Sequence, residues 1–239
     1  MKKLITICII LLSSTVLQAQ FFSKKITGNK QEIKTTRNTP EYDGIVVLGS
    51  FDVKLVKGTE GNLTIHIEEN LAPYLITEVS KGKLTIRWKK GIHIRTKKHV
   101  LIEVPIQSIA ALSLIGSGNI YTDETIKEET FKISISGSGD IMLTLDTDLT
   151  KSSIAGSGNI KLKGISKKLK CAVSGSGGFY GKDFKCKNVH VSIAGSGDAA
   201  VFASDKLSAS IAGSGDISYY GNPTTEDINV SGSGKVSMH

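Results

Sequence analysis

Two aspartates that each follow a glycine-serine-glycine triplet, Asp198 and Asp216, are the residues whose type and spacing best fit catalysis. They stand one sequence repeat apart, and on stacked strands that spacing would place their carboxylates about 5 Å from each other. Paired carboxylates at such a separation are typical of retaining glycosidases. One function to weigh is therefore a carbohydrate-active enzyme, a polysaccharide lyase or glycosidase with a shallow groove.

The same position fits an architectural role better. Along the chain it holds Asn119, Asp140, Asn159, Gly178, Asp198, Asp216 and Lys235. Asparagine and aspartate favour turn conformations, and only one adjacent pair of acids occurs, so the column avoids most self-repulsion. Repeats of 18 to 21 residues also leave little room for the long loops that wall a catalytic cleft. We therefore expect no catalytic residues and no enzymatic activity.

Metal and cofactor chemistry are not indicated by the spacing of the ligand-type residues. The histidines His66, His93, His99, His190 and His239 show no metal-ligand spacing. Calcium-binding β-roll repeats recur every nine residues, about half the period found here. A phosphate loop needs a glycine-rich turn that leads into a helix and carries a lysine. We expect no metal site and no cofactor.

The triplets define an internal repeat, because they recur at intervals of 21, 19, 19, 20, 18 and 19 residues. Aliphatic or small apolar residues stand two positions before and, in most repeats, four positions after the first glycine, which indicates half-buried strands on both sides of a turn. A unit of about 19 residues cannot bury its own apolar face, so the units must stack. The sequence predicts an all-β fold, a right-handed parallel β-helix or solenoid of about seven coils.

The glycines are assigned a structural role at the corners of the coils. A corner that needs positive φ is accessible at low cost only to glycine, and stacked corners need the same residue in each layer. The serine between the two glycines is expected to hydrogen-bond along the stack. The predicted turn residues are Gly116, Gly118, Gly137, Gly139, Gly156, Gly158, Gly175, Gly177, Gly195, Gly197, Gly213, Gly215, Gly232 and Gly234.

The N-terminus has the features of an export signal. Lys2 and Lys3 precede an apolar run, and a small-residue cleavage site at Leu17-Gln18-Ala19 follows, so residues 1–19 are predicted to be a signal peptide. Residues 20–40 are polar and are expected to form a linker. Residues 41–105 are expected to be an N-terminal β region that caps or continues the solenoid, and residues 106–239 the repeat solenoid. No transmembrane segment is expected.

A basic run lies in the N-terminal β region, and the chain as a whole carries a formal charge of +8. "KLTIRW" and "IHIR" alternate so that Arg87 and Arg95 point outward, and the Lys89-Lys90-Gly91 stretch is expected to be a hairpin tip. A solvated strand face explains the run; the functional alternative is contact with an anionic glycan or headgroup. The candidate polyanion-binding residues are Arg87, Lys89, Lys90, Arg95, Lys97 and Lys98. Nucleic acid is not expected, because exposed aromatic residues do not interleave with these charges.

Two cysteines, Cys171 and Cys186, lie beyond the predicted signal peptide. An even number in an oxidising compartment makes a disulfide one alternative. Cys171 shares its column with Ser152 and Val191, so the other alternative is a small buried residue.

The order of motifs resembles a known family. The stretches "YDGIVVLGSFDVKLVKG", "ENLAPYL", "GKLTIRW" and "LIEVPIQSIAALSLIGSGNI", followed by serial "GSGDI", are similar to the putative auto-transporter adhesin, head GIN domain family. The resemblance extends over residues 42–236. It implies an exported protein of Gram-negative bacteria with a fold like the right-handed β-helices, and it supplies no catalytic residues.

Taken together, these features predict an exported, non-enzymatic β-helix protein that acts in adhesion or binds a surface polymer or protein at the bacterial envelope. Its location would be the periplasm, the outer-membrane surface or the medium. The expected partners are a surface glycan or other envelope polymer and a second copy of the chain, which would dock on the open C-terminal coil.

Overall fold

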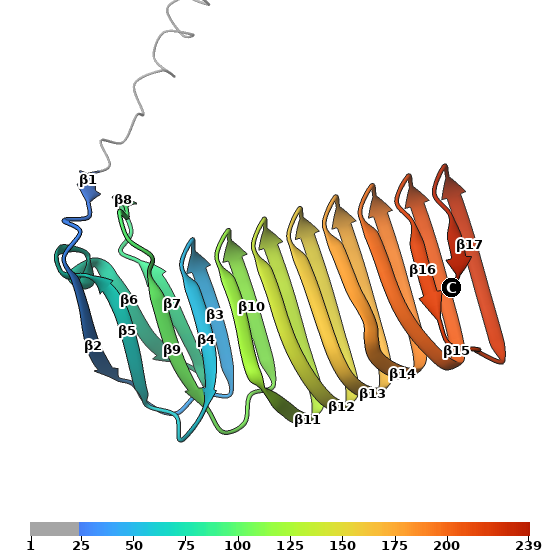
Figure 1. Cartoon of the computed structure of the whole chain (residues 1–239), viewed down its shortest axis with the longest axis horizontal. Coiled ribbons are helices and arrows are strands. Elements are labelled where there is room, and N and C mark those ends of the chain that lie inside the picture. The colour runs from blue at the N-terminus through green and yellow to red at the C-terminus, as the bar shows by residue number, and fades with distance from the viewer. Residues whose placement is uncertain (1–23) are drawn as a thin grey trace, which may run out of the picture.

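The computed structural model describes residues 24–239 and shows a β-solenoid of about seven turns (Figure 1). The predicted signal peptide, residues 1–19, lies outside the described residues. Five long strands each make one complete coil: β11 (Asn119–Gly137), β12 (Asp140–Gly156), β13 (Asn159–Gly175), β14 (Gly178–Gly195) and β15 (Asp198–Gly213). Neighbouring coils pair in parallel, with the equivalent residues of each repeat in register.

Each coil contributes to two parallel sheets. The half that leaves a glycine corner belongs to what we call the descending sheet, and the half that reaches the next corner belongs to the ascending sheet, whose arrowheads lie along the top in Figure 1. Side chains alternate between the interior and the solvent in both halves. The interior positions are aliphatic or aromatic in most coils, for example Ile141, Ile160 and Phe179 from the descending sheet, and stack into one continuous core.

The glycine corners stack directly on one another. The first glycine of each triplet has a φ between +114° and +144°, a region that L side chains rarely adopt. A Cβ on the first glycine would also meet the preceding corner, since one on Gly137 would lie 2.3 Å from the carbonyl oxygen of Gly116. The third glycine has no positive φ and is explained by this close packing alone: a Cβ on Gly139 would lie 2.1 Å from the carbonyl oxygen of Gly118 in the preceding coil.

The serine between the glycines contributes through its backbone. The N–H of Ser138 donates to the carbonyl oxygen of Gly116 at 2.9 Å, and the other triplets repeat this bond. The serine side chains lie at the surface of the corner. The bond along the stack is thus made by the peptide group, while the side chain faces the solvent.

The first corner of the solenoid lies at Gly49, which the triplet pattern did not include. β3 (Gly44–Gly49) pairs with β10 (Ala111–Gly116), so that Gly49 stands in register with Gly116, and β4 (Asp52–Lys57) pairs with β11. Phe51 replaces the third glycine and is buried, with its ring edge-on to Trp88 at 5.7 Å between centroids. A side chain fits here because Gly49 is the first corner of the stack.

The coils nearest the N-terminus do not stack in chain order. β7 (Lys83–Trp88) and β9 (Leu101–Ile106) pair with the outer side of β3 and β4, although they come later in the chain. β5 (Asn62–Glu68) and β6 (Leu75–Ser80) then add antiparallel strands to this end, and the short 3-10 helix η2 (Glu69–Tyr74) joins them. After β9, the chain crosses to the other side of β3 and β4, where β10 pairs with β3 and the regular repeats begin.

Two local expectations for this region are wrong. The segment expected to be a linker contains β1 (Lys24–Thr27) and β2 (Glu32–Asn38), because β2 finds an antiparallel partner in β5 and β1 a parallel partner in β8 (Ile92–Arg95). The hairpin joins β6 to β7 through Lys81 and Gly82, both at positive φ. The Lys89-Lys90-Gly91 turn instead leads to β8, which pairs with β1 and not with β7.

β16 (Ile217–Tyr220) and β17 (Thr225–Gly232) form the coil after β15, and β18 (Val236–Met238) starts the next coil by pairing in parallel with β16. Every residue of β17 is exposed, including Ile228 and Val230, whose register partners in the preceding coil are buried. Across residues 24–239, no helix has the length and apolar character that a membrane span requires.

Candidate functional site

A row of cationic side chains runs along the ascending sheet. Lys132, Lys151, Lys170 and His190 occupy the same position of four successive coils, and each is the register partner of the next. All four are exposed. Because adjacent strands in a sheet are about 4.8 Å apart, the row presents one cationic or imidazole group per coil in a straight line.

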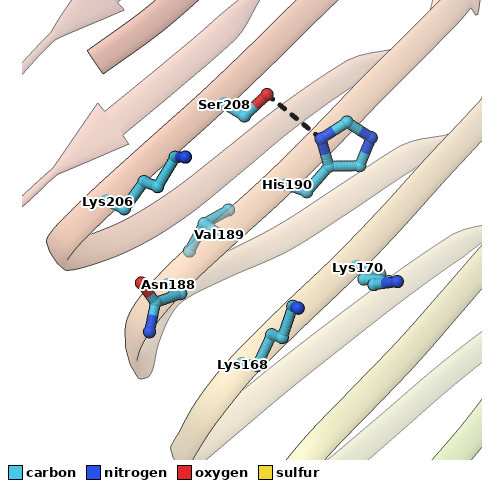
Figure 2. Close-up of a pocket in the computed structure, with 7 residues that line it drawn as sticks. All are labelled: Lys168, Lys170, Asn188, Val189, His190, Lys206 and Ser208. Carbon is cyan, nitrogen blue, oxygen red and sulfur yellow. Dashed lines mark hydrogen bonds between the residues drawn. The ribbon is translucent and has the colours of Figure 1, made fainter. Parts of the chain in front are cut away.

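A second row lies two residues earlier on the same strands and adds lysines beside the first. Lys168 is followed by Asn188 and Lys206 on the next two coils. Lys170 and His190 of the first row and all three residues of the second line an open hollow of about 580 Å³, which we call the basic hollow. Its lining residues are Lys168, Lys170, Asn188, Val189, His190, Lys206 and Ser208 (Figure 2).

The basic hollow is lined by residues of neighbouring strands, and His190 and Ser208 are in hydrogen-bond contact within it. Leu169, Val189 and Leu207 form the buried layer directly beneath it. The Nδ1 atom of His190 lies 3.1 Å from the Oγ of Ser208, which orients the imidazole along the row, and Figure 2 shows this contact between neighbouring strands. The floor is therefore formed by paired strands, whereas the lysine side chains are exposed to the solvent.

The lysines of the two rows are free of carboxylate partners throughout the part of the chain that the structure describes. Lys132, Lys151, Lys168, Lys170 and Lys206 form no ion pair with any residue of the range 24–239. An ion pair to Lys167 does occur next to Lys168, with Asp148 at 2.7 Å, but it lies outside the hollow lining. The hollow is thus a local excess of positive charge.

A flat platform of small side chains lies between the cationic rows and the glycine corners. Two outward rows cover it, and from β10 to β15 all but one of their residues are serine or alanine; they are Ser113, Ser134, Ser153, Ala172, Ser192 and Ser210, and Ile115, Ser136, Ala155, Ser174, Ala194 and Ala212. The side chains here are short, so a long ligand could lie against the sheet.

Asp198 and Asp216, the aspartates considered for catalysis, instead form hydrogen bonds between successive coils. Asp198 Oδ1 accepts the backbone N–H of Asp216 at 2.9 Å, and Asp216 Oδ1 accepts that of Lys235 at 2.8 Å. Asp140 and Asn159 make the same contact to the next coil. Both acids stand at an exposed corner, and neither lines the basic hollow. We call this column of side-chain oxygens the Asx ladder.

The Asx ladder begins at Asp52, one coil before Asn119, the first position that follows a triplet. Asp52, which follows the Gly49 corner, accepts both the backbone N–H and the side-chain amide of Asn119 at 2.9 Å through Oδ1. Its Oδ2 lies 2.8 Å from Nε2 of His99. Among residues 24–239, no group of three or more histidine, cysteine, aspartate or glutamate side chains is placed so that it could hold a metal ion.

The structure divides the basic residues that the sequence grouped near the N-terminus. Arg87 pairs with Glu78 at 3.0 Å, and Lys98 lies 3.7 Å from Glu32. Lys89 and Lys90 lie in the turn before β8, and Arg95 ends that strand. The backbone N–H groups of Lys97 and Lys98 donate to the carboxylate of Glu68, so this part of the run fixes the loop after β8.

Among the residues that the structure describes, Cys171 and Cys186 are free and buried. Burial raises the pKa of each thiol to about 12. Cys171 belongs to the ascending sheet, in register with Ser152 and Val191, and Cys186 to the descending sheet, in register with Ser166 and Ala203. The disulfide alternative is therefore wrong for this structure, and the small-buried-residue alternative holds.

The cationic row was accessible from the sequence but was not identified there. Aligning the repeats on the first glycine places Lys132, Lys151, Lys170 and His190 five residues before it each time. The second row depends on which residues face outward after the bend of each coil, which the alignment alone does not show.

The chain is similar to solved structures over almost its whole length. A putative adhesin from Bacteroides fragilis NCTC 9343 is 20% identical, with a TM-score of 0.83, and the match covers 90% of this chain and all of that one. A putative lipid binding protein from Parabacteroides distasonis ATCC 8503 is 28% identical, with a TM-score of 0.76 and the same coverage. A putative adhesin from Parabacteroides merdae ATCC 43184 is 21% identical, with a TM-score of 0.70, over 90% and 99% of the two chains.

A search of curated proteins found no match. Residues 41–223, from the strand before the Gly49 corner to the last full coil, match the family model described as "Putative auto-transporter adhesin, head GIN domain". The names of the family and its neighbours agree with a non-enzymatic surface protein. The chain therefore belongs to the putative auto-transporter adhesin, head GIN domain family.

Proposed function

We propose that this protein is a non-catalytic binding protein of the bacterial cell envelope that holds a linear polyanion, an acidic polysaccharide, on its ascending sheet. The proposal rests chiefly on one observation: five exposed lysines in two adjacent rows, together with His190, lack ion-pair partners in the described part of the chain.

The cationic row costs stability, which argues that it has a purpose beyond the fold. Like charges directly opposite each other on neighbouring strands repel. The adjacent outward rows contain serine and alanine at the equivalent places, so the solenoid tolerates neutral residues there. Lysine at three successive coils is therefore better explained by a ligand that neutralises it.

The geometry favours an extended polymer over a compact ligand. The cationic groups follow the solenoid axis with one group per coil, about 4.8 Å apart. Each sugar ring of a polyuronate carries one carboxylate, and the length of a ring along the chain is comparable with that spacing. The Ser/Ala platform beside the rows would accommodate the width of such a chain without a steep-sided cleft.

Export to the envelope is part of the proposal. The family name refers to an adhesin, and several structural neighbours are named putative adhesins. The predicted signal peptide would direct the chain across the inner membrane, after which it would act in the periplasm, at the outer-membrane surface or in the medium. Catalysis is not proposed, because Asp198 and Asp216 are occupied in the Asx ladder.

The test compares two triple variants that remove the same charge. Binding to immobilised polygalacturonate is measured by interferometry for the wild type, for K168S/K170S/K206S and for K89S/K90S/R95S, which alters the basic residues near β8. We expect the first variant to bind about tenfold more weakly, since each exposed ion pair contributes up to about 1 kcal/mol. The second should retain most of the affinity, and a neutral glucan should not bind.

Equal losses in the two variants would show that net charge alone determines the binding, and would contradict a site in the basic hollow. Loss confined to K89S/K90S/R95S would move the site to the N-terminal basic residues. Circular dichroism melting curves confirm that each variant is folded, and exposed lysines on a β-surface should change the melting temperature little.

A further inference from the structure

The outer surface of the descending sheet carries a different kind of patch. Exposed apolar side chains are unusual there because the coils bury their aliphatic residues, yet Met142, Ile165 and Tyr180 are 44%, 53% and 47% exposed. In the row of register partners that contains Ile165, Asp146 precedes it and Lys185, Phe202 and Tyr220 follow it. What we call the apolar-cationic patch consists of Met142, Lys161, Lys163, Ile165, Tyr180, Lys182, Lys185, Phe202 and Tyr220.

Lysines are interleaved with the apolar side chains of this patch. Lys161 lies between Met142 and Tyr180 in one row. Lys185 Nζ lies 3.9 Å from the centre of the Phe202 ring, and Lys182 Nζ lies 4.7 Å from the centre of the Tyr220 ring. Both ring contacts place an ammonium group beside an aromatic side chain at the protein surface.

This combination matches the chemistry of a membrane surface. Aromatic and aliphatic side chains favour the boundary between headgroups and acyl chains, whereas lysines beside them attract anionic headgroups. Long lysine side chains can also lie along apolar neighbours while their ammonium groups reach the headgroups. The patch lies on one sheet of the solenoid, so its side chains could contact a bilayer together.

Two other occupants fit less well. A second copy of the chain would bring lysine against lysine in a symmetric contact, and like charges repel. A sugar that stacks on aromatic side chains would need several free ring faces, but Lys185 and Lys182 lie over the rings of Phe202 and Tyr220, which leaves Tyr180 as the one aromatic ring of the patch without a lysine over it. We infer that the apolar-cationic patch docks the protein on a lipid bilayer that contains anionic headgroups.

This inference is independent of the polymer site, because the two use different sheets. In β14, Tyr180, Lys182 and Lys185 belong to the descending half, whereas His190 belongs to the ascending half. Docking through the descending sheet would leave the basic hollow facing away from the membrane. Loss of one activity should therefore leave the other unchanged.

The experiment is flotation of the protein with vesicles of phosphatidylglycerol and phosphatidylcholine, compared with vesicles of phosphatidylcholine alone. The wild type should float with the anionic vesicles. The variant I165S/Y180S should partition about tenfold more weakly at the same salt, because it removes two apolar side chains that the bilayer would bury. K182S/K185S should also bind weakly, and K168S/K170S/K206S should float like the wild type.

Three results would overturn the inference. The first is that the wild type fails to float with anionic vesicles at low salt. The second is that I165S/Y180S floats as well as the wild type, since the apolar side chains would then not enter the bilayer. The third is that I165S/Y180S loses polygalacturonate binding instead of vesicle binding, which would assign the patch to a glycan. Circular dichroism verifies that each variant is folded.

Discussion

The side chain of Asp198 accepts a hydrogen bond from the backbone nitrogen of Asp216, 2.9 Å away on the next coil. Repetition of this contact joins successive coils at their corners, beyond the ladder bonds of the sheets. An acid that accepts a backbone N–H at an exposed corner has a structural role in the stack.

The first prediction concerns this ladder. Replacement of Asp198 by alanine removes the acceptor for the Asp216 N–H and should lower the free energy of unfolding by about 1 kcal/mol. Asp198→Asn keeps a side-chain oxygen at the same place, as Asn159 does in its own coil, and should be nearly neutral. Urea unfolding measures both. Equal destabilisation by alanine and asparagine would show that the charge matters and not the acceptor.

The second prediction separates the two reasons for glycine. Gly91 has a φ of +76°, and a Cβ added there would meet open space, so Gly91→Ala tests the backbone conformation alone and should cost about 1 kcal/mol. Gly197 has no positive φ, but a Cβ there would lie 2.2 Å from the carbonyl oxygen of Gly177. Gly197→Ala should cost at least about 3 kcal/mol, because the neighbour is backbone and cannot rotate away.

Urea unfolding monitored by circular dichroism gives both values. A Gly197→Ala variant no less stable than Gly91→Ala would contradict close packing as the reason for the third glycine. If Gly197→Ala does not fold, the result agrees with the prediction, and Gly197→Ser should then fail in the same way.

The third prediction follows from a buried carboxylate. Glu68 is fully buried, and burial alone would raise its pKa. Its oxygens accept the backbone N–H groups of Lys97 at 2.7 Å, Lys30 at 2.7 Å and Lys98 at 3.2 Å, and these donors lower the pKa below its ordinary value. The ionised carboxylate thereby holds the segment after β1 and the loop after β8 to β5.

A lowered pKa in the folded state means that the unfolded chain takes up the proton first. The contribution of Glu68 to stability is therefore present above about pH 4.5 and is lost as the pH falls through the folded pKa. Glu68→Gln should flatten the decline of stability in this range, whereas Glu69→Gln, at an exposed neighbour, should not. Unfolding curves from about pH 3 to 7 compare the two, and identical slopes would contradict this role.

The fourth prediction concerns the thiols. Because burial raises the pKa of Cys171 and Cys186 to about 12, neither should be deprotonated at about pH 8. A disulfide reagent should leave the native protein unlabelled for hours and label both thiols once urea unfolds the chain. Rapid labelling of the native protein, or a mass two hydrogens lower than the free-thiol value, would contradict the buried arrangement.

The repeat could be predicted from sequence because its signals are local. Each triplet and its flanking aliphatic residues recur in every coil, and the stacked register of Gly137 on Gly116 follows from that recurrence. The stacking order of the N-terminal coils is harder to predict from the sequence, because β7 and β9 stack outside β3 and β4 although they come later in the chain. Such placement depends on pairings between distant segments, which no short motif encodes.

The candidate site residues also divide into those with a local sequence signal and those brought together only by the fold. The Gly49 corner does not match the triplet pattern, because Phe51 stands in place of the third glycine. A side chain is tolerated at that position only where no earlier corner stacks on it. The basic residues around Lys89 looked like one cluster in the sequence, but Glu78 and Glu32 pair with two of the six. Lys168 and Lys206 are 38 positions apart and gather in one hollow only because two coils separate them.

The most direct test of the account is a nuclear magnetic resonance titration of the isotope-labelled protein with oligogalacturonate. A polyanion held on the ascending sheet should shift the backbone amide resonances of Lys168, Lys170, His190 and Lys206, together with those of the Ser/Ala platform. The resonances of the descending sheet should stay in place. Shifts that concentrate around Lys89, Lys90 and Arg95, or that are absent at saturating ligand, would contradict the basic hollow as the polymer site.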